Sequence, residues 1–266
     1  MPGPKAGALV TAVAQRWSEG RTRFRPAGEL IRTAEYDVAP IAADAVAKAF
    51  VETHHYSRTF PAARVRVGLY RRGALVGVAV FSHPCSDKVL TSVFPDARSS
   101  VELGRFVLLD EVPGNGETWF LARCFELLRA AGFRGVVSFS DPVPRDTADG
   151  CRVFLGHIGT IYQAHNARYL GRGTARRLRL LPDGRTLSDR ALQKIRDGSR
   201  GWRYAAAQLE AFGADAAPAD DRGAWLATWL PRLTRAVAHP GNHKYAWALD
   251  RRLALPVSLA YPKAVA

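Results

Sequence analysis

Side chains capable of proton transfer gather in two short stretches of this sequence. His55 and Tyr56 are adjacent, and a neutral imidazole next to a phenol can accept or relay a proton because the usual pKa of histidine lies near neutrality. Ser140 and Asp141 close the apolar run 135–140, and strand ends of this kind carry ligand-binding groups in open α/β sheets. The structural alternative is a helix end for the histidine and a turn before Pro142 for Ser140 and Asp141.

Tyr162 and His157 extend this set. A tyrosine hydroxyl can act as a general acid when it reaches a leaving group, although single tyrosines also serve as core residues. His55, Asp141 and His157 are candidate ligands for one metal ion, iron or zinc, but their spacing in the sequence shows no metal site. The sequence alone therefore does not identify a metal.

A strand and the turn after it carry a second group of candidates. Glu102 and Arg105 are separated by an odd number of residues, so a regular strand places their side chains on opposite faces. Backbone amides of Gly114, Asn115 and Gly116 precede a helix, where they could cradle a phosphate or pyrophosphate of a group donor. A turn between a strand and a helix also requires glycine for purely structural reasons.

Positive charge is concentrated in one region. The 266-residue chain has 38 Lys and Arg against 24 Asp and Glu, a net charge of +14, and residues 168–203 hold eleven basic residues but only three aspartates. Arginine binds phosphate with two parallel hydrogen bonds, so this region predicts a nucleic acid as a partner; the alternative is a solvated Arg-rich surface. The candidate DNA-binding residues are Arg168, Arg172, Arg176, Arg177, Arg190, Lys194, Arg196, Arg200 and Arg203.

Alternation and helical spacing predict the elements that position these residues. A helix is expected from Pro40 over 41–50, a hairpin over 65–81, a strand over 101–109, a helix from Glu117 that ends at Gly132, and a strand over 135–140. A short helix is expected over 161–167. This order predicts a mixed α/β sheet flanked by helices.

The remaining sequence predicts an appendage to that sheet. A hairpin is expected over 176–187, then a helix capped by Ser188, a helix over 202–212 and a flexible linker over 213–221. We divide the chain into a loosely structured, basic lead-in (1–36), a catalytic core (37–182) and a basic helical extension with a C-terminal segment that packs on the core (183–266), within a single domain overall.

Composition narrows the class of protein. Hydrophobic residues make up 47% of the chain, enough for a full core, and no stretch has the length and apolarity of a membrane span. The three cysteines lack the CxxC spacing of a structural zinc site and argue against a disulfide framework, which fits a reducing cytoplasm.

Several of these segments resemble known families. The order of elements and the segment IYQAHNARYLG are similar to the GNAT acetyltransferase superfamily, in which a tyrosine on the last core helix acts as general acid. Four ordered segments resemble the Mom family of phage DNA-modification proteins, as does HPGNHKYAWAL (239–249). They are HHYSRTFP (54–61), VELGRFVLLDEVPGNGETWFLAR (101–123), VVSFSDP (136–142) with HIGTIYQAHNARYLGR (157–172), and GRTLSDRALQKIR (184–196).

The Mom resemblance implies an enzyme that converts the exocyclic amine of adenine in DNA to a carbamoylmethyl derivative, protecting phage or mobile-element DNA from restriction in a bacterial cytoplasm. It implies catalytic roles for His55, Tyr56, Arg105, Ser140, Asp141 and Tyr162, with His157 and Asn166 as further binding residues. It also implies iron and a small-molecule group donor, acyl-CoA-like or other. The standard acetyltransferase pyrophosphate loop is missing, and the segment 144–154 is longer than expected.

Two alternatives remain open. The first is an acyl-CoA-dependent N-acetyltransferase acting on a small molecule or a protein, which requires acetyl-CoA to bind at the turn 113–117. The second is a non-catalytic DNA-binding protein, for which the basic region would suffice. No covalent change to DNA is expected from the latter, and its binding would weaken with salt.

Overall fold

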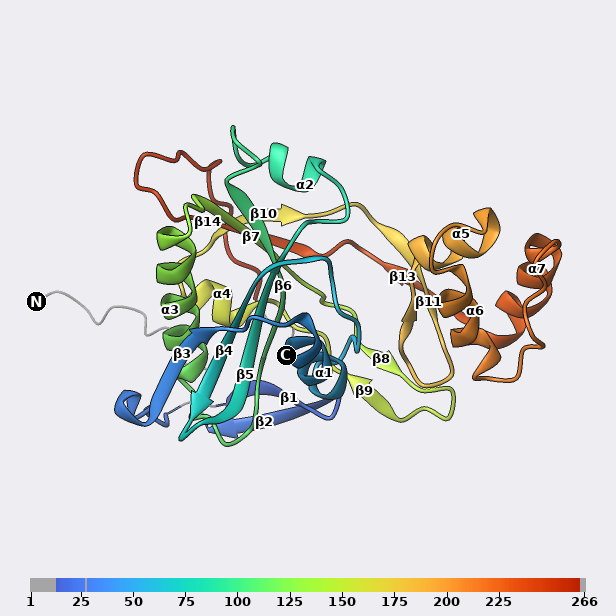
Figure 1. Cartoon of the computed structure of the whole chain (residues 1–266), viewed down its shortest axis with the longest axis horizontal. Helices are drawn as coiled ribbons and strands as arrows, with labels where there is room; N and C mark the ends of the chain where they lie inside the picture. The colour runs from blue at the N-terminus through green and yellow to red at the C-terminus, as the bar shows by residue number, and fades with distance from the viewer. Residues whose placement is uncertain (1–12, 27, 264–266) are drawn as a thin grey trace, which may run out of the picture. The chain divides into compact units, whose positions relative to one another are not determined.

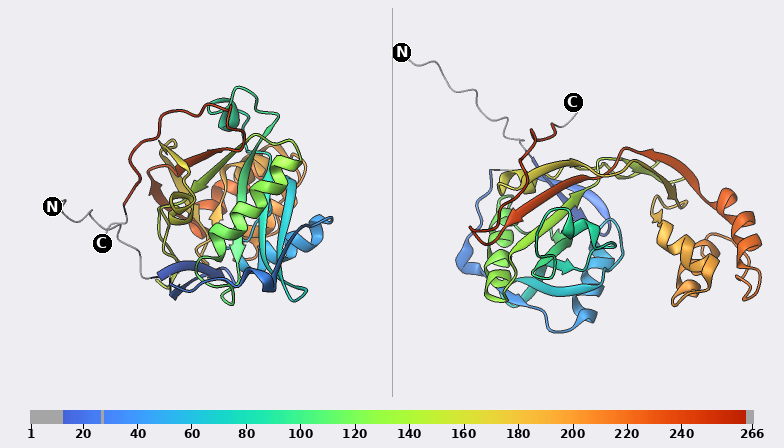
Figure 2. Two further views of the ribbon diagram at one scale, coloured as in Figure 1. Left: turned by 90° about the vertical axis from the view of Figure 1, so that its left-hand side faces the viewer. Right: turned by 90° about the horizontal axis from the view of Figure 1, so that it is seen from above.

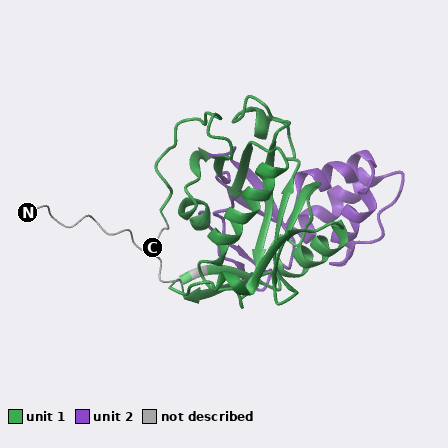
Figure 3. Cartoon of the chain, turned by 60° about the vertical axis from the view of Figure 1, so that its left-hand side comes forward, with its two compact units in different colours: residues 1–139, 159–171, 244–266 green, residues 140–158, 172–243 purple. Residues whose placement is uncertain are grey.

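The computed structural model describes residues 13–26 and 28–263 and divides into two compact units. Unit 1 comprises residues 1–139, 159–171 and 244–266, and unit 2 comprises residues 140–158 and 172–243 (Figure 3). Each unit is therefore assembled from segments that lie far apart in the sequence.

Unit 1 is built on a seven-stranded sheet with strand order β10-β14-β7-β6-β5-β4-β3 (Figure 1). Neighbours from β3 to β6 are antiparallel, whereas β6 and β7 are parallel, so the sheet is mixed as expected. Its strands are β3 (Tyr36–Pro40), β4 (Ala63–Arg71), β5 (Ala74–Ser82), β6 (Ser100–Leu108), β7 (Gly135–Ser140), β10 (Arg168–Arg172) and β14 (His243–Ala248).

Helices cover this sheet and bury its side chains. Ala79 and Phe81 of β5 belong to a core shared with α3, while Val78 and Val80, which alternate with them, are also fully buried. Both faces of β5 are therefore covered. Figure 2 (left) shows α3 lying across the strands. The helical segments of unit 1 are η1 (Thr33–Glu35), α1 (Asp44–His54), α2 (Lys88–Thr91), α3 (Gly116–Ala130) and α4 (Thr160–Ala164).

Unit 2 consists of short strands and three helices. A three-stranded sheet has the order β12-β11-β13, and a separate two-stranded ladder pairs β8 with β9. Leu192 and Ile195 of α5, Leu209 of α6 and Trp225 of α7 meet in one apolar cluster. The elements are β8 (Arg145–Asp146), β9 (Arg152–Phe154), β11 (Arg176–Leu180), β12 (Thr186–Leu187), α5 (Asp189–Asp197), α6 (Trp202–Glu210), α7 (Arg222–Leu233) and β13 (Arg235–His239).

Most expected elements are found close to their predicted bounds. The hairpin of β4 and β5 turns at Arg72 and Gly73, both with positive φ, and β11 and β12 form the expected second hairpin. The hydroxyl of Ser188 accepts a hydrogen bond from the amide of Ala191 (3.1 Å), so the predicted N-cap of α5 is confirmed. The mixed α/β sheet flanked by helices is also confirmed.

Three local expectations are wrong. The lead-in contains an antiparallel hairpin, β1 (Val13–Ser18) with β2 (Arg21–Pro26), whose residues Arg16 and Trp17 find their side-chain partners in distant segments. The helix expected from Pro40 begins at Asp44, since Pro40 closes β3. The expected linker 213–221 is tied down: the Trp225 indole donates to the carbonyl of Asp215, and the amide of Ala217 donates to Glu210, both at 2.9 Å. Residues 1–12 of the expected lead-in lie outside the described residues.

The C-terminal segment also has a definite place. β14 pairs between β7 and β10, so a strand formed by residues 243–248 completes the central sheet of unit 1. Tyr245 and Trp247 of this strand join the main core. Within the described ranges, every helix is too short or too polar to cross a bilayer.

Candidate functional site

A bulge in β6 brings Glu102 and Arg105 to the same face of the sheet. Ser82 of β5 pairs with Glu102, whereas Val80 pairs with Arg105, so Gly104 is an extra residue in β6. Residues 80 and 82 share a face of β5, and their partners must share one too. The expected placement of Glu102 and Arg105 on opposite faces is therefore wrong, because it assumed a regular strand.

Glu102 is a half-buried carboxyl with an altered acidity. Desolvation raises its pKa from 4.5 to about 7, and the nearby charges of Arg105 and Lys244 oppose this only in part. No hydrogen bond to its carboxylate comes from the described residues. The group can therefore gain and lose a proton near neutral pH, which is the requirement for a general base.

Tyr162, on α4, is the second titratable group near Glu102. Burial raises its pKa well above the usual value, and a hydrogen bond with Ser138 of β7 opposes this rise. Its ring packs against Tyr245 at a centroid distance of 5.4 Å. The phenol therefore keeps its proton at neutral pH, as a general acid must.

Arg105 supplies positive charge to this group. Its Nε donates to the carbonyl of Thr59 (2.8 Å) and a terminal nitrogen donates to the Thr59 hydroxyl (2.6 Å). Burial lowers the pKa of Arg105, while the neighbouring Tyr56, Glu102 and Tyr162 raise it. The four side chains thus lie close enough to influence one another electrostatically, which brings together three of the predicted catalytic residues.

His55 and Tyr56 belong to an aromatic stack with Trp17 of β1. Tyr56 lies 4.7 Å from the Trp17 ring and 4.2 Å from the His55 ring, measured between centroids. Nδ1 of His55 accepts a hydrogen bond from the amide of Ser57 (3.1 Å) and lies 2.9 Å from its hydroxyl. His55 is buried, so it is placed to orient Tyr56, whose side chain is only partly buried.

The turn before α3 is filled by the protein's own side chains. Arg16 of β1 forms a buried ion pair with Glu117 and donates to the carbonyl of Pro113 (2.9 Å). Arg25 pairs with the carboxylate of Glu29 (2.7 Å) and lowers its pKa, and the amide of Gly114 also bonds this carboxylate and adds to the lowering. Two carboxylates therefore lie at the turn that was expected to hold an anionic donor.

The rest of this turn is also engaged. The side-chain oxygen of Asn115 accepts from the amide of Ile31 (2.7 Å), and the amide of Gly116 donates to Pro113 (2.9 Å). A Cβ at Gly116 would lie 2.5 Å from Val112, so close packing requires glycine here. Gly114, Asn115 and Gly116 thus each have a structural role, and donor binding by them stays a prediction.

In unit 2, Asp141 is the centre of a buried polar cluster. Its oxygens accept from the amide of Val143 (3.0 Å), from Arg145 in a buried ion pair, and from Nε2 of His239 (3.0 Å). The amide of Gly241 donates to Nδ1 of the same histidine (3.0 Å), so Nε2 carries the proton. Asp141 therefore ties the segment after β7 to β13, and its catalytic role stays a prediction.

Ser140 and His157 are the other predicted residues of unit 2. The hydroxyl of Ser140 is buried, with no hydrogen-bond partner in the described part of the chain. Desolvation lowers the pKa of His157 to about 4, opposed by the charge of Asp141, and its backbone amide donates to the Asp141 carbonyl (2.8 Å). Its imidazole is therefore neutral at neutral pH.

The candidate metal ligands do not form a recognisable set. His55 belongs to unit 1, whereas Asp141 and His157 belong to unit 2. Across the described ranges, no three His, Cys, Asp or Glu side chains are grouped as ligands for one ion. The described residues thus do not fit the iron that the resemblance implied.

Asn166 and the basic residues lie at the surface. Asn166 is exposed and has a φ of +56°, so it serves the turn that ends α4. Arg168 approaches the carbonyl of Pro256 (3.5 Å), and Arg176 donates to Asn242 (3.3 Å). The other predicted DNA-binding residues are exposed or half-buried, and DNA contact stays a prediction for all of them.

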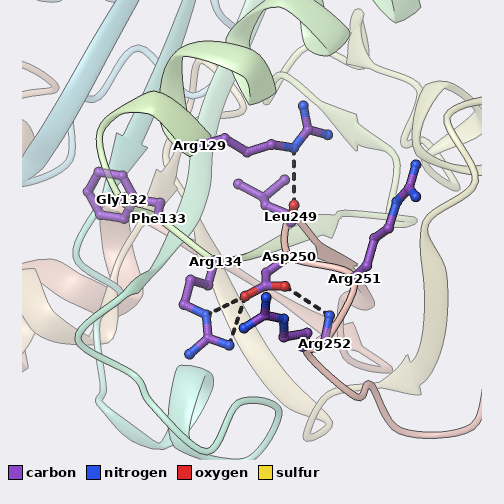
Figure 4. A pocket seen from close by; sticks show the side chains of 8 residues that line it. All are labelled: Arg129, Gly132, Phe133, Arg134, Leu249, Asp250, Arg251 and Arg252. Atoms are coloured by element: carbon purple, nitrogen blue, oxygen red, sulfur yellow. Dashed lines mark hydrogen bonds and ion pairs between the residues drawn. The ribbon is translucent and has the colours of Figure 1, made fainter.

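An open hollow of about 470 Å³ lies at the C-terminal end of α3 (Figure 4). Arg134 forms an ion pair with Asp250 (2.9 Å), and Arg129 donates to the carbonyl of Leu249 (3.1 Å). Arg251 and Arg252 complete its basic lining. None of the predicted site residues lines this hollow.

Comparison with known sequences decides the family. The model of the Mom protein family matches residues 35–218, which is more than half of the chain. The chain belongs to the Mom protein family. The match covers the Glu102, Arg105 and Tyr162 positions as well as helices α5 and α6. No curated protein sequence matches this Mom family chain.

Solved structures give only a loose likeness. A tandem GNAT protein from the clavulanic acid biosynthesis pathway is 11% identical, with 81% of this chain and 99% of that one covered and a TM-score of 0.43. A Bacillus subtilis acetyltransferase in complex with CoA is 7% identical, with 89% and 98% covered and a TM-score of 0.33. An N-acetyltransferase from Staphylococcus aureus Mu50 is 13% identical, with 70% and 68% covered and a TM-score of 0.31.

Sequence reasoning missed two participants in the unit 1 site. Strand alternation predicts the wrong face for Glu102, and no role is predicted for Ser138 from the sequence. A lone carboxylate within the apolar strand VELGRF is a signal for Glu102, because such a group is rarely buried without purpose. The alternation in VVSFS places Ser138 on the same face as Ser140, which could have indicated its position.

Proposed function

We propose that this chain is a transferase that attaches a small acyl-derived group, of the carbamoylmethyl type, to the exocyclic amine of adenine in DNA. Membership of the Mom family supports the choice of substrate. The observation that carries the chemistry is Glu102, a carboxyl group with a pKa of about 7 beside Arg105 and Tyr162.

The chemistry of the adenine amine, which accepts the transferred group, explains why a carboxylate base is needed. The lone pair of the adenine amine is delocalised into the ring, so the nitrogen becomes nucleophilic only as its proton leaves. The Glu102 carboxylate takes that proton while the new carbon–nitrogen bond forms. The bond between the transferred carbon and its leaving group breaks in the same reaction.

Tyr162 and Arg105 act on the group donor. Tyr162 keeps its proton at neutral pH and donates it to the departing group. The guanidinium of Arg105 is fixed by Thr59 and stabilises negative charge on the donor. Tyr56, oriented by its contacts with Trp17 and His55, stacks on an adenine flipped out of the duplex.

The donor is a small molecule that is recognised away from the turn 113–116. Ion pairs of Glu29 with Arg25 and of Glu117 with Arg16 already fill this turn. The amides of Gly114 and Gly116 bond to the chain itself, so they are not free to bind a pyrophosphate. We therefore favour a donor without a diphosphate at this position over a conventional acyl-CoA. Titration calorimetry with acetyl-CoA tests this choice: micromolar binding would contradict it and favour an N-acetyltransferase.

Double-stranded DNA is the proposed macromolecular partner. The net charge of +14 and the basic region 168–203 support binding to a polyanion. We further propose that the modification protects phage or mobile-element DNA from restriction inside a bacterial host. The described residues do not fit a metal ion, and the proposed roles use none.

Mass spectrometry of nucleosides tests the function directly. Plasmid DNA from cells that express the chain should yield deoxyadenosine in which a carbamoylmethyl-type group replaces one hydrogen. Glu102→Gln should remove this product. Glu126→Gln, which neutralises an exposed carboxylate on α3, is the matched control and should leave the product unchanged.

Each outcome bears on a different part of the proposal. Unmodified nucleosides from cells with abundant folded protein would overturn DNA modification. A product that persists in Glu102→Gln would remove Glu102 from the chemistry while leaving the substrate in place. A different added mass would keep adenine as acceptor and correct the identity of the group.

A further inference from the structure

Helices α5 and α6 of unit 2 form a helix–turn–helix arrangement. They are joined by the four-residue turn 198–201, in which Gly198 and Gly201 have positive φ angles of +64° and +85°. Both helices pack their apolar sides into one cluster with α7. DNA-binding proteins use two helices joined by a short, glycine-containing turn to place residues of the second helix against the duplex.

Arg222 of α7 holds this turn in place. Its Nε donates to the carbonyl of Ile195 near the end of α5 (3.0 Å), and its guanidinium lies 5.2 Å from the ring centroid of Trp202. A Cβ at Gly198 would lie 2.6 Å from this guanidinium. The start of α6 is therefore fixed relative to α5, so the surface that the pair presents is preformed.

The surface of this pair is strongly basic. Arg200 and Arg203 are exposed, and Lys194 is half-buried near the turn, where a Cβ at Gly201 would lie 3.5 Å from its Nζ. Within residues 13–26 and 28–263, no carboxylate pairs with these three cations. The nearest acidic residue along the chain, Asp197, accepts instead from Gln193 (2.7 and 2.9 Å).

An aromatic side chain lies among these charges. Tyr204, in the first turn of α6, is 71% exposed, although residues of its size are usually more buried. Arg203 lies over the ring of Trp202 at 4.5 Å, which limits the directions that its guanidinium can take. Unpaired cations around an exposed ring suit a phosphate backbone better than an apolar partner.

We propose that α5, the turn 198–201 and α6 are the surface that docks on the backbone of double-stranded DNA. Lys194, Arg200 and Arg203 contact phosphates, and Tyr204 lies against the duplex. The proposed function supplies only the choice of DNA as the polyanion. Docking itself requires no chemistry at Glu102, so the two proposals can fail separately.

Fluorescence anisotropy with a labelled 30-base-pair duplex tests the docking surface. The whole chain carrying Lys194→Gln, Arg200→Gln and Arg203→Gln should bind about tenfold more weakly or worse at 0.15 M salt. The slope of log K against log salt concentration should become shallower by about 2.7, because each lost phosphate contact contributes about 0.9. Tyr204→Ala should weaken binding while leaving this slope unchanged.

A matched triple variant controls for overall charge. Arg21→Gln, Arg32→Gln and Arg98→Gln remove three exposed charges from unit 1 and should leave affinity within twofold. Equal losses in both triple variants, or no loss in the first, would overturn the docking surface. Thermal unfolding should be the same for all variants, and a lowered Tm would assign the loss to misfolding and contradict the proposal.

The same proteins separate docking from chemistry. Glu102→Gln should bind the duplex like the wild type, whether or not DNA is modified. A wild-type chain that binds no duplex would overturn both proposals, whereas binding without modification would overturn the proposed function alone. Stronger binding to an RNA duplex or to polyglutamate than to DNA would contradict DNA as the ligand of the α5–α6 surface.

Discussion

Two carboxyl groups, the half-buried Glu102 in unit 1 and the buried Asp141 in unit 2, have opposite surroundings. Asp141 accepts hydrogen bonds from Val143, Arg145 and His239, so all its partners are already in place. Glu102 is desolvated without comparable donors, and its pKa rises to about 7. The difference shows that burial alone does not make a carboxyl group reactive. A carboxylate whose hydrogen-bond partners are all in place stabilises the structure, whereas one without such partners is available to exchange a proton.

The strongest test of this contrast removes the exchangeable proton. Glu102→Gln should lower kcat for modification by about 10²–10⁴-fold, the usual contribution of a general base. Because glutamine keeps the shape of the side chain, DNA affinity and Tm should not fall. Single-turnover kinetics on duplex DNA measures the loss, with Glu126→Gln as control. Full activity in Glu102→Gln would show that Glu102 is not the reactive carboxyl group and would contradict the contrast with Asp141.

The second test removes Asp141, the carboxylate whose hydrogen-bond partners are all in place. Asp141→Ala leaves Arg145 buried without its partner, and breaking a buried pair in this way costs about 3–5 kcal/mol. The free energy of unfolding, measured by urea denaturation, should fall by that amount. Asp146→Ala, which breaks an exposed ion pair with Arg152, should cost less than about 1 kcal/mol. If Asp141→Ala kept full stability but lost activity, Asp141 would belong with the reactive groups.

A third test follows the pH dependence of Glu102. The base must be deprotonated, so the modification rate should rise about tenfold per pH unit up to pH 7 and then level off. If the rate were limited by a step that involves no proton transfer, it would not change with pH over this range. A profile that instead falls between pH 5 and 7 would exclude Glu102 as the base.

The same group predicts a smaller change in stability. A carboxyl whose folded-state pKa is raised contributes stability below its unfolded value, and this contribution is lost as the pH rises through about 7. Between pH 4 and pH 8, Glu102→Gln should therefore gain about 2 kcal/mol relative to the wild type, allowing for partial solvent screening. Urea denaturation of both proteins at the two pH values measures this difference.

The smallest expected effect lies in unit 2, away from both carboxyl groups. Ser188→Ala removes the side-chain cap of α5 and should lower the free energy of unfolding by about 1 kcal/mol. Ser188→Asn should restore most of it, since asparagine caps helices well. A loss that asparagine fails to rescue would show that Ser188 does more than cap the helix.

Local patterns in the sequence were sufficient for most elements of this fold. The alternation in β4 and β5, the glycine that ends α3 and the cap at Ser188 act over a few residues, so their physical causes are visible in the sequence. The β1–β2 hairpin was missed because Arg16 and Trp17 find their partners, Glu117 and Tyr56, far along the chain. Long-range pairing of this kind leaves no periodic signal.

The candidate site was only partly predictable for a related reason. Side-chain chemistry marks Tyr56 and Tyr162 as candidates, and the family resemblance implies a catalytic role for them and for Arg105, but neither source supplies their surroundings. The roles of Glu102 and Asp141 depend on burial and on partners such as His239, which lies 98 residues from Asp141. Spacing along the chain contains no information about either property.

The extra residue at Gly104 makes the pairing of β6 with β5 as important to the site as residue identity. Without the bulge, the three-residue separation of Glu102 and Arg105 would place their side chains on opposite faces of the sheet, although no charged residue would be lost. Substitution is also restricted, since a Cβ at Gly104 would lie 2.6 Å from the hydroxyl oxygen of Ser82. In evolutionary terms, relatives that keep the glutamate and the arginine three residues apart but pair this strand without a bulge would have inherited the residues of the site without its geometry.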